Sequence, residues 1–301
     1  MSQWQGKSEA NTLGYKIFVH ILRRFGLRRA YLLLRFVSLH YFLFHWKSSK
    51  PILYVYKNKL GYGFFKALWK LRENYYVFGQ TIIDKVALLA KIKTDFTFNF
   101  DGRHHLDEIV RQGKGGLLLS AHVGNWEAAG QMLEHLNTSI NIVMYDGEDA
   151  NIKKYLDAVT GERLFKIILV KPDLSHIFQI KAALAKNEIV CMHADRFLPG
   201  NKTITTPFLG EDALFPYGPF LLSLKLNVPV VHVYAFKETN KHYHFYSSDL
   251  YYYNKSKGDT EQTVLKDYVS NLETKLKLYP EQWFNYYDFY KKDSGTVSIE
   301  R

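Results

Sequence analysis

Residues 113–127 read GKGGLLLSAHVGNWE, and this stretch decides how the chain folds. A continuous apolar run follows the glycines, which is typical of a strand that is buried on both faces of a sheet. We expect the strand to end at His122, where Gly124 permits a tight turn. Asn125 is then a good cap for a following helix, and Glu127 falls in the first turn of that helix, where a negative charge is favourable.

Strand and helix patterns alternate along the rest of the chain. The predicted strands cover 115–122, 140–144, 167–170, 189–193 and 228–236, with an edge strand at 243–246. The predicted helices cover 62–92, 106–111, 127–136, 152–160, 175–185, 219–226 and 260–278. This alternation predicts an α/β fold with a largely parallel central sheet flanked by helices.

His122 and Glu127 are candidates for acid–base chemistry. In open α/β sheets, ligands bind at the carboxyl ends of the strands, where His122 is expected. The turn at 123–125 lets the two side chains converge. A carboxylate beside one ring nitrogen fixes the tautomer, so that the other nitrogen can take a proton from a substrate hydroxyl. From the spacing alone, a structural histidine at the start of a helix is the alternative.

The composition is that of a folded, basic protein. Apolar residues make up 47% of the 301 residues, and the mean hydropathy of −0.23 is too polar for a polytopic membrane protein. The single cysteine, Cys191, excludes an intrachain disulfide and favours a reducing compartment. The net charge of +11 favours anionic partners.

The N-terminal 50 residues hold nine Lys or Arg and one acid, which accounts for +8 of the net charge of +11. Within them, 30–46 is the most apolar stretch, but as a helix it reaches only about 25 Å, less than the roughly 30 Å hydrocarbon core of a bilayer. Arg24, Arg28, Tyr31 and Arg35 recur at helical spacing. We therefore predict one basic face on an amphipathic helix that lies in a membrane interface. A core helix with a solvated basic edge is the alternative.

The run at 113–127 resembles the first block of the lipid A biosynthesis (late) acyltransferases. They belong to the glycerolipid acyltransferase superfamily, whose mark is a His followed, after four residues, by Asp or Glu. The resemblance continues through LSHIFQIKAALAKNEIVCMHAD at 174–195, TPFLGEDALFPYGPFLLSLKLNVPVVHVYAF at 206–236 and PEQWF at 280–284. Together these blocks cover roughly residues 100–290. With the KSSKP stretch at 47–51 as the boundary, we expect a membrane anchor at 1–48 and an acyltransferase domain at 49–301.

The resemblance implies a membrane-associated O-acyltransferase. It would move a fatty acyl chain from an acyl carrier protein or CoA thioester to a hydroxyl of a lipid A precursor or related glycolipid. His122 would be the general base and Glu127 its orienting partner, with no bound cofactor. The implied location is the cytoplasmic face of the bacterial inner membrane.

The acceptor has alternatives. The ending NYYDFYKK at 285–292 replaces the basic cluster that is typical of the family. An aminolipid acylated on nitrogen, or a polyene-type pigment lipid, could therefore be the acceptor instead. Nucleic acid is not an expected partner, because a nucleic-acid-binding role would leave the acyltransferase blocks unexplained.

Seven further residues are candidates for substrate binding: Asn125, Trp126, Arg163, Asp195, Arg196, Phe208 and Gly210. Asp195 matches an acidic position of the family and should lie at the same sheet edge as His122. Arg196, where the family usually has Gln, could bind phosphate or form a structural ion pair. Trp126 could wall an acyl tunnel, and Phe208 could equally be plain core. The histidines show no H-E-x-x-H pattern and no cysteine partners, so we expect no metal site.

Overall fold

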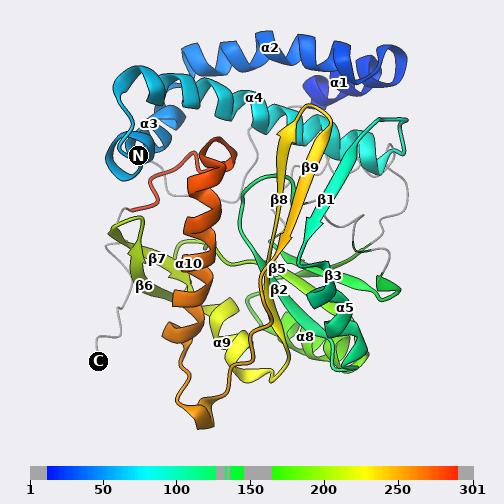
Figure 1. The fold of residues 1–301 in the computed structure, drawn as a ribbon, viewed down its shortest axis with the longest axis vertical. Coiled ribbons are helices and arrows are strands. Elements are labelled where there is room, and N and C mark those ends of the chain that lie inside the picture. Colours follow the sequence, from blue (N-terminus) through cyan, green and yellow to red (C-terminus); the bar gives the residue numbers. More distant parts are fainter. Residues whose placement is uncertain (1–11, 127–132, 134–135, 146–164, 291–301) are drawn as a thin grey trace.

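The computed structural model describes residues 12–126, 133, 136–145 and 165–290. In it a central sheet lies beneath a layer of N-terminal helices (Figure 1). The predicted helices at 127–136 and 152–160 fall largely or wholly outside the described residues.

The central sheet has seven strands in the order β1-β9-β8-β2-β5-β3-β4. The strands are β1 (Thr97–Asp101), β2 (Gly116–Ser120), β3 (Ile140–Met144), β4 (Lys166–Leu169), β5 (Ile189–His193), β8 (Val230–Thr239) and β9 (His242–Ser247). Strands β8, β2, β5, β3 and β4 are parallel to one another. The predicted α/β class with a mostly parallel sheet is confirmed.

Strand β2 occupies the middle of the sheet, and all five of its residues are buried. Leu117 and Leu119 pack into one core cluster, whereas Leu118 packs into another on the opposite face. This alternation follows from the pleat, which points successive side chains to opposite faces. The apolar run in the quoted sequence is therefore needed to fill two cores at once.

Two features of the sheets differ from the prediction. The strand expected at an edge is β9, but β1 pairs beyond it and is the edge strand. In addition, β6 (Thr203–Phe208) and β7 (Glu211–Pro216) form a separate antiparallel hairpin that the sequence did not predict. A proline inside β6 weakens the strand signal there. At the turn of this hairpin, Leu209 and Gly210 have φ angles of 49° and 82°.

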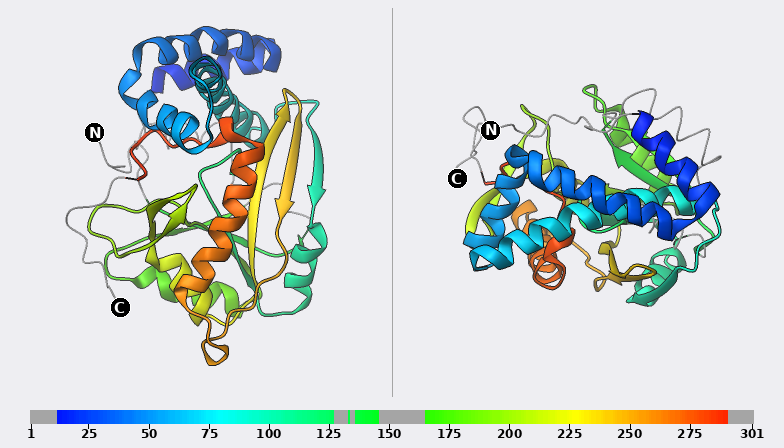
Figure 2. Two further views of the ribbon diagram at one scale, coloured as in Figure 1. Left: turned by 60° about the vertical axis from the view of Figure 1, so that its left-hand side comes forward. Right: turned by 90° about the horizontal axis from the view of Figure 1, so that it is seen from above.

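Helices cover the sheet, as Figure 2 shows from two further directions. They are α5 (Arg103–Arg111), α8 (Ser175–Ala185), α9 (Tyr217–Lys225) and α10 (Glu261–Leu278), with the 3₁₀ turns η3 (Lys255–Lys257) and η4 (Pro280–Gln282). The helices predicted at 106–111, 175–185, 219–226 and 260–278 are thus confirmed, with shifts of up to three residues at their ends.

The N-terminal layer consists of α1 (Thr12–Phe25), α2 (Leu27–Phe44), α3 (Trp46–Tyr54) and α4 (Phe64–Leu89). The π-helical segment η1 (Val55–Lys59) follows α3. Gly26, with a φ of 78°, separates α1 from α2. Arg24 therefore belongs to a different helix from Arg28, Tyr31 and Arg35, and Tyr31 is buried. The prediction of one continuous basic face through these four residues is wrong, because the chain bends at Gly26.

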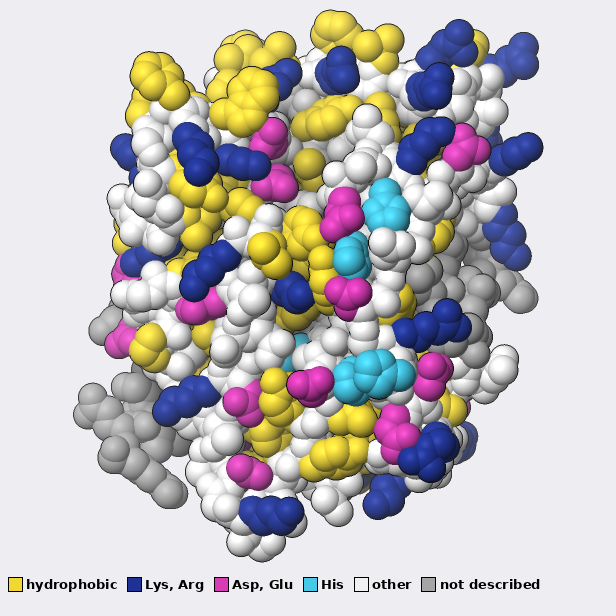
Figure 3. Space-filling model, in the orientation of Figure 1, with side chains coloured by type: hydrophobic (Ala, Val, Ile, Leu, Met, Phe, Trp, Pro, Cys, Tyr) yellow, Lys and Arg dark blue, Asp and Glu magenta, His cyan; other side chains and the backbone are white. Residues whose placement is uncertain are grey.

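The same layer presents apolar side chains to the outside. The exposed ones are Ile17, Phe25, Leu32, Phe36, Leu39, Leu43, Phe44, Trp46, Tyr54, Phe64, Phe65 and Trp69, which we call the apolar rim. Figure 3 shows apolar side chains beside basic ones along the upper edge of the molecule, where α2 runs. Among the described residues, none of the helices combines the length and the apolar character that crossing a bilayer requires.

Candidate functional site

A tight turn follows β2 and carries His122. Gly124 has a φ of 57°, and a Cβ at this position would collide with the backbone oxygen of Ala235 on β8. The same oxygen accepts a hydrogen bond of 2.7 Å from the backbone N–H of Asn125. Only glycine fits so close to β8 in this conformation, so the glycine of the quoted sequence fixes where the histidine lies.

The PEQWF segment holds this turn from the other side. The backbone N–H of Gly124 donates to the Gln282 oxygen at 2.9 Å, and Val123 forms an isolated β-bridge with Trp283. The buried Gln282 side chain in turn accepts from the Lys237 N–H and donates to the Lys237 oxygen. The family resemblance includes the PEQWF segment, but the sequence did not predict that this segment contacts and holds the turn that carries His122.

A carboxylate two residues beyond the neighbouring strand β5 orients His122. One oxygen of Asp195 lies 2.7 Å from Nδ1 of His122, and the other accepts the His122 backbone N–H at 2.9 Å. Asp195 is almost completely buried. The predicted orienting partner, Glu127, lies outside the described residues. The sequence placed Asp195 at the same sheet edge, as the structure does, but did not assign it this contact.

The charge of Asp195 is stabilised at this position. Burial alone would raise the pKa of the carboxyl, but the charge and hydrogen bond of His122, together with the charges of Arg196 and His193, hold that pKa below its ordinary value. With Asp195 ionised, Nδ1 of His122 donates to it, which leaves the lone pair of the neutral imidazole on Nε2.

A narrow apolar cavity lies beside this pair. Its wall includes Trp126 and His193, whose rings meet edge to face with 4.6 Å between centroids. The His193 ring also lies 4.3 Å from the His122 ring, centroid to centroid. The apolar part of the wall is formed by Leu118, Leu133, Ile140, Ile142, Cys191, Met192 and Val233. Trp126 lines this apolar space, and its role as the wall of an acyl tunnel stays a prediction.

A buried polar network lies behind the turn and was missed in the sequence. The Asn125 amide donates to Tyr243 Oη at 3.2 Å, and Tyr243 donates to Asp84 on α4. Lys237 Nζ pairs with Asp84 at 2.6 Å, and Tyr31 from α2 donates to the same carboxylate. Burial raises the pKa of Asp84 and lowers that of Lys237, each against the attraction of its partner. The network ties the N-terminal helices to the histidine turn.

The remaining predicted residues lie in different surroundings. Phe208 is fully buried and packs on Phe215, Trp283 and Phe289. Gly210 lies in the β6–β7 turn, and its positive φ explains why a glycine occupies this position. Arg196 donates to the Phe284 oxygen at 2.7 Å, so it contacts the C-terminal segment. Arg163 lies outside the described residues.

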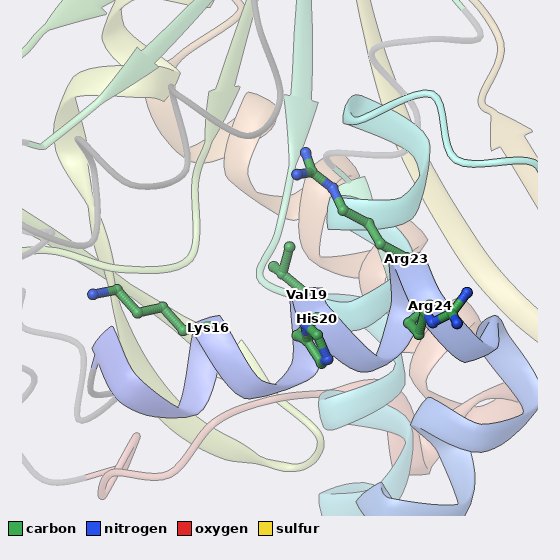
Figure 4. Close-up of a pocket in the computed structure, with 5 residues that line it drawn as sticks. All are labelled: Lys16, Val19, His20, Arg23 and Arg24. Carbon is green, nitrogen blue, oxygen red and sulfur yellow. The ribbon is translucent and has the colours of Figure 1, made fainter.

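Two other groupings of polar side chains occur in the described part of the chain. His122, His193 and Asp195 have potential metal-ligand atoms within 4.8 Å of one another, although the histidine pattern predicts no metal site. The hydrogen bond between His122 and Asp195 fits an acid–base pair. Separately, a shallow groove on α1 is lined by basic side chains around Val19, including Lys16 and Arg24 (Figure 4).

Comparisons with known proteins show similarity to acyltransferases. A family model described as bacterial lipid A biosynthesis acyltransferase matches residues 70–292. The chain is also similar to a phosphatidylinositol mannoside acyltransferase of Mycobacterium tuberculosis, with 23% identity over 138 residues. That match covers 46% of this chain and 43% of the mycobacterial protein, so the chain spans less than half the length of this relative.

Proposed function

Because the chain belongs to the bacterial lipid A biosynthesis acyltransferase family, and is therefore an acyltransferase, we propose that it acylates a hydroxyl of a lipid A precursor or related glycolipid. The donor is a fatty acyl thioester of acyl carrier protein or CoA. The observation that carries the proposal is the hydrogen bond of 2.7 Å between His122 Nδ1 and buried Asp195. The glycolipid named in the mycobacterial relative supports this class of acceptor.

His122 acts as general base in this reaction. Its Nε2 takes the proton of the acceptor hydroxyl while the oxygen attacks the thioester carbonyl carbon. The C–S bond then breaks, and the imidazolium returns the proton to the leaving thiolate. Asp195 stays ionised throughout and stabilises the imidazolium, and general-base assistance of this kind contributes about 10²–10⁴ in rate.

The apolar cavity supplies a place for the part of the acyl group nearest the reacting carbonyl. It begins at Trp126 and His193, next to the His122 ring, and continues over the apolar residues of β2, β3 and β5. A chain entering here would carry its carbonyl beside the base. The cavity has a volume of about 40 Å³, so it takes only the few atoms next to the carbonyl, and each methylene buried there contributes about 0.8 kcal/mol.

The apolar rim and the basic residues of the N-terminal layer fit an anionic membrane surface. Leu32, Phe36, Leu39 and Leu43 recur at helical spacing on α2 and are all exposed. Apolar side chains can enter the interface while lysines and arginines meet lipid headgroups. On this basis the enzyme works at the cytoplasmic face of the bacterial inner membrane, where its acceptor is embedded.

The catalytic part of the proposal is tested with His122→Ala. This variant should lose acyl transfer while its thermal unfolding remains close to that of the unaltered enzyme. Acyl-CoA and acyl carrier protein donors are offered with matched hydroxyl-bearing and amine-bearing lipid acceptors. Transfer to hydroxyls supports the proposal; exclusive transfer to amines contradicts it, and normal turnover by His122→Ala contradicts the role of the base.

The membrane part needs point substitutions rather than truncation. Tyr31 and Leu34 are buried against α4, so deleting 1–48 would expose core surface as well as remove the rim. We expect Phe36→Asp with Leu43→Asp to reduce binding to phosphatidylglycerol vesicles in a sedimentation assay. Phe178→Asp is the matched control, because Phe178 is equally exposed but lies on α8. Equal loss in rim and control variants would contradict the assignment.

A further inference from the structure

His122 is held at both of its backbone polar groups. Its N–H donates to one oxygen of the Asp195 carboxylate at 2.9 Å, and its carbonyl oxygen accepts from the Phe284 N–H at 3.3 Å. The second bond is longer than the usual range of about 2.7–3.2 Å between an N–H nitrogen and an oxygen acceptor. How firmly Phe284 supports the histidine therefore depends on what else holds Phe284.

Arg196 holds Phe284 at its carbonyl. The Nη2 of Arg196 donates to the Phe284 oxygen at 2.7 Å, and the guanidinium lies over the ring of Tyr287, 5.7 Å from the ring centroid. A hydrogen bond from a charged donor is roughly twice as strong as one between neutral groups. Phe284 is buried, so removing the guanidinium would take this charged donor away from a carbonyl in the protein interior.

These contacts form a closed ring around the histidine. Asp195 and Arg196 are consecutive in the chain: the first binds the His122 N–H, and the second binds the Phe284 oxygen. Phe284 closes the ring by donating to the His122 oxygen. Because the same carboxylate also orients the imidazole at Nδ1, loss of one side of the ring lets the histidine backbone move relative to the group that orients its side chain.

We infer that Arg196 is a positioning residue, which holds His122 against Asp195 through the backbone of Phe284. This inference rests on the proposed acyl transfer by His122. The sequence left two other roles open for Arg196, namely binding of a substrate phosphate and a structural ion pair. The hydrogen bond of 2.7 Å to the Phe284 oxygen supports the positioning role, and the three roles predict different kinetics.

The test compares Arg196→Met and Arg196→Lys with the unaltered enzyme in steady-state acyl transfer from palmitoyl-CoA to a hydroxyl-bearing glycolipid. Methionine fills much of the same space without a donor, whereas lysine keeps a charged donor on a side chain of similar length. In Arg196→Met we expect kcat to fall about tenfold, as loss of one such hydrogen bond allows, while the KM values for donor and acceptor change less than about twofold. Arg196→Lys should recover most of the lost kcat.

The other two roles of Arg196 predict other results. A raised KM with a normal kcat would show that Arg196 binds substrate, and a lower melting temperature with normal kcat and KM would show a purely structural contact; either result would overturn the inference. An equal loss of kcat in Arg196→Lys and Arg196→Met would overturn it too. Arg111→Met is the matched control, because Arg111 also makes side-chain hydrogen bonds, to Glu108, but is exposed on α5. The control should keep normal kinetics.

A second measurement does not depend on turnover. The Nδ1–H proton of His122 is observed by NMR and assigned by its absence in His122→Ala. Because this proton lies in the hydrogen bond to Asp195, a looser bond moves its resonance upfield, which we expect in Arg196→Met but not in Arg111→Met.

An unchanged resonance in Arg196→Met would refute the positioning role, whether or not the unaltered enzyme transfers an acyl group. If the enzyme transfers none but the resonance moves, the proposed function fails while the contact between Arg196 and the histidine turn stands. If Arg196→Met does not fold, Arg196→Gln replaces it, because its shorter side chain does not reach the Phe284 oxygen, and the same losses are expected.

Discussion

Replacing Asp195 by asparagine tests the proposed base most directly. The carboxylate uses both oxygens on His122, one for Nδ1 at 2.7 Å and one for the backbone N–H at 2.9 Å. An asparagine offers only one oxygen. If that oxygen keeps the backbone N–H, the amide NH₂ faces Nδ1, and the imidazole must move its proton to Nε2. The ring then has no lone pair on the nitrogen that accepts the substrate proton.

In the opposite orientation, the oxygen of the new asparagine faces Nδ1 of His122, and the proton stays on Nδ1. The asparagine NH₂ then faces the buried backbone N–H of His122, so two donors meet. Such an unpaired buried group costs about 1–3 kcal/mol, and the charge that stabilises the imidazolium is also lost. Both effects reduce the active population, so we expect kcat to fall by about 10²–10⁴ in Asp195→Asn. Thermal unfolding should change far less, because the side chain keeps its volume.

Steady-state acyl transfer and thermal unfolding are measured on the same preparations. Asp249→Asn is the matched control, because Asp249 also lies beside a histidine, His105, but is exposed. The control should retain normal turnover. If Asp195→Asn turned over as fast as the control, Asp195 would not orient the base, and the proposed mechanism would be wrong.

The Asp195→Asn variant also tests how the stability of the fold depends on pH. His122 holds the pKa of Asp195 below its ordinary value against the effect of burial. The unfolded chain therefore binds the Asp195 proton more tightly than the folded chain does. Ionised Asp195 stabilises the fold at a pH above the ordinary carboxyl pKa, and this stabilisation is lost as the pH falls toward the lower pKa of the folded state. Between about pH 5 and pH 3, the unfolding free energies of the unaltered enzyme and Asp195→Asn should converge. A difference that widens with acid would contradict this reasoning.

Three substitutions around the histidine turn test its supports by thermal unfolding and acyl transfer. Gly124→Ala adds a Cβ that collides with the Ala235 oxygen, and it also forces alanine into a positive φ. We therefore expect the free energy of unfolding to fall by at least about 2 kcal/mol and most of the turnover to be lost. A neutral effect would contradict this geometry. Lys237→Met leaves Asp84 buried without its cation, so we expect the free energy of unfolding to fall by about 3–5 kcal/mol. Adding Asp84→Leu to this variant should recover part of that loss. If the losses of the two single variants simply add in the double variant, the two residues do not act as a coupled pair. Gln282→Leu removes both side-chain hydrogen bonds to Lys237, so we expect the free energy of unfolding to fall by about 2 kcal/mol or more. An unchanged melting temperature would show that Gln282 does not hold the PEQWF segment in place.

The sequence alone determined the fold class and the position of His122 in it. Strands predicted at 140–144 and 189–193 match β3 and β5 residue for residue, because apolar runs bounded by polar turns have few other stable arrangements. It also placed His122 just beyond a buried strand and required a glycine at the following turn. Those features are local, so neighbouring residues are sufficient to specify them.

Only the tertiary structure decided which carboxylate reaches His122 in the described part of the chain. Ser120 pairs with His193 where β2 and β5 lie side by side, so the residues two positions further along each chain, His122 and Asp195, meet at the sheet edge although 73 residues separate them. Strand order is set by long-range packing and leaves no local signal. The same holds for the brace by Gln282 and for the edge strand β1, because each depends on a partner distant in the sequence.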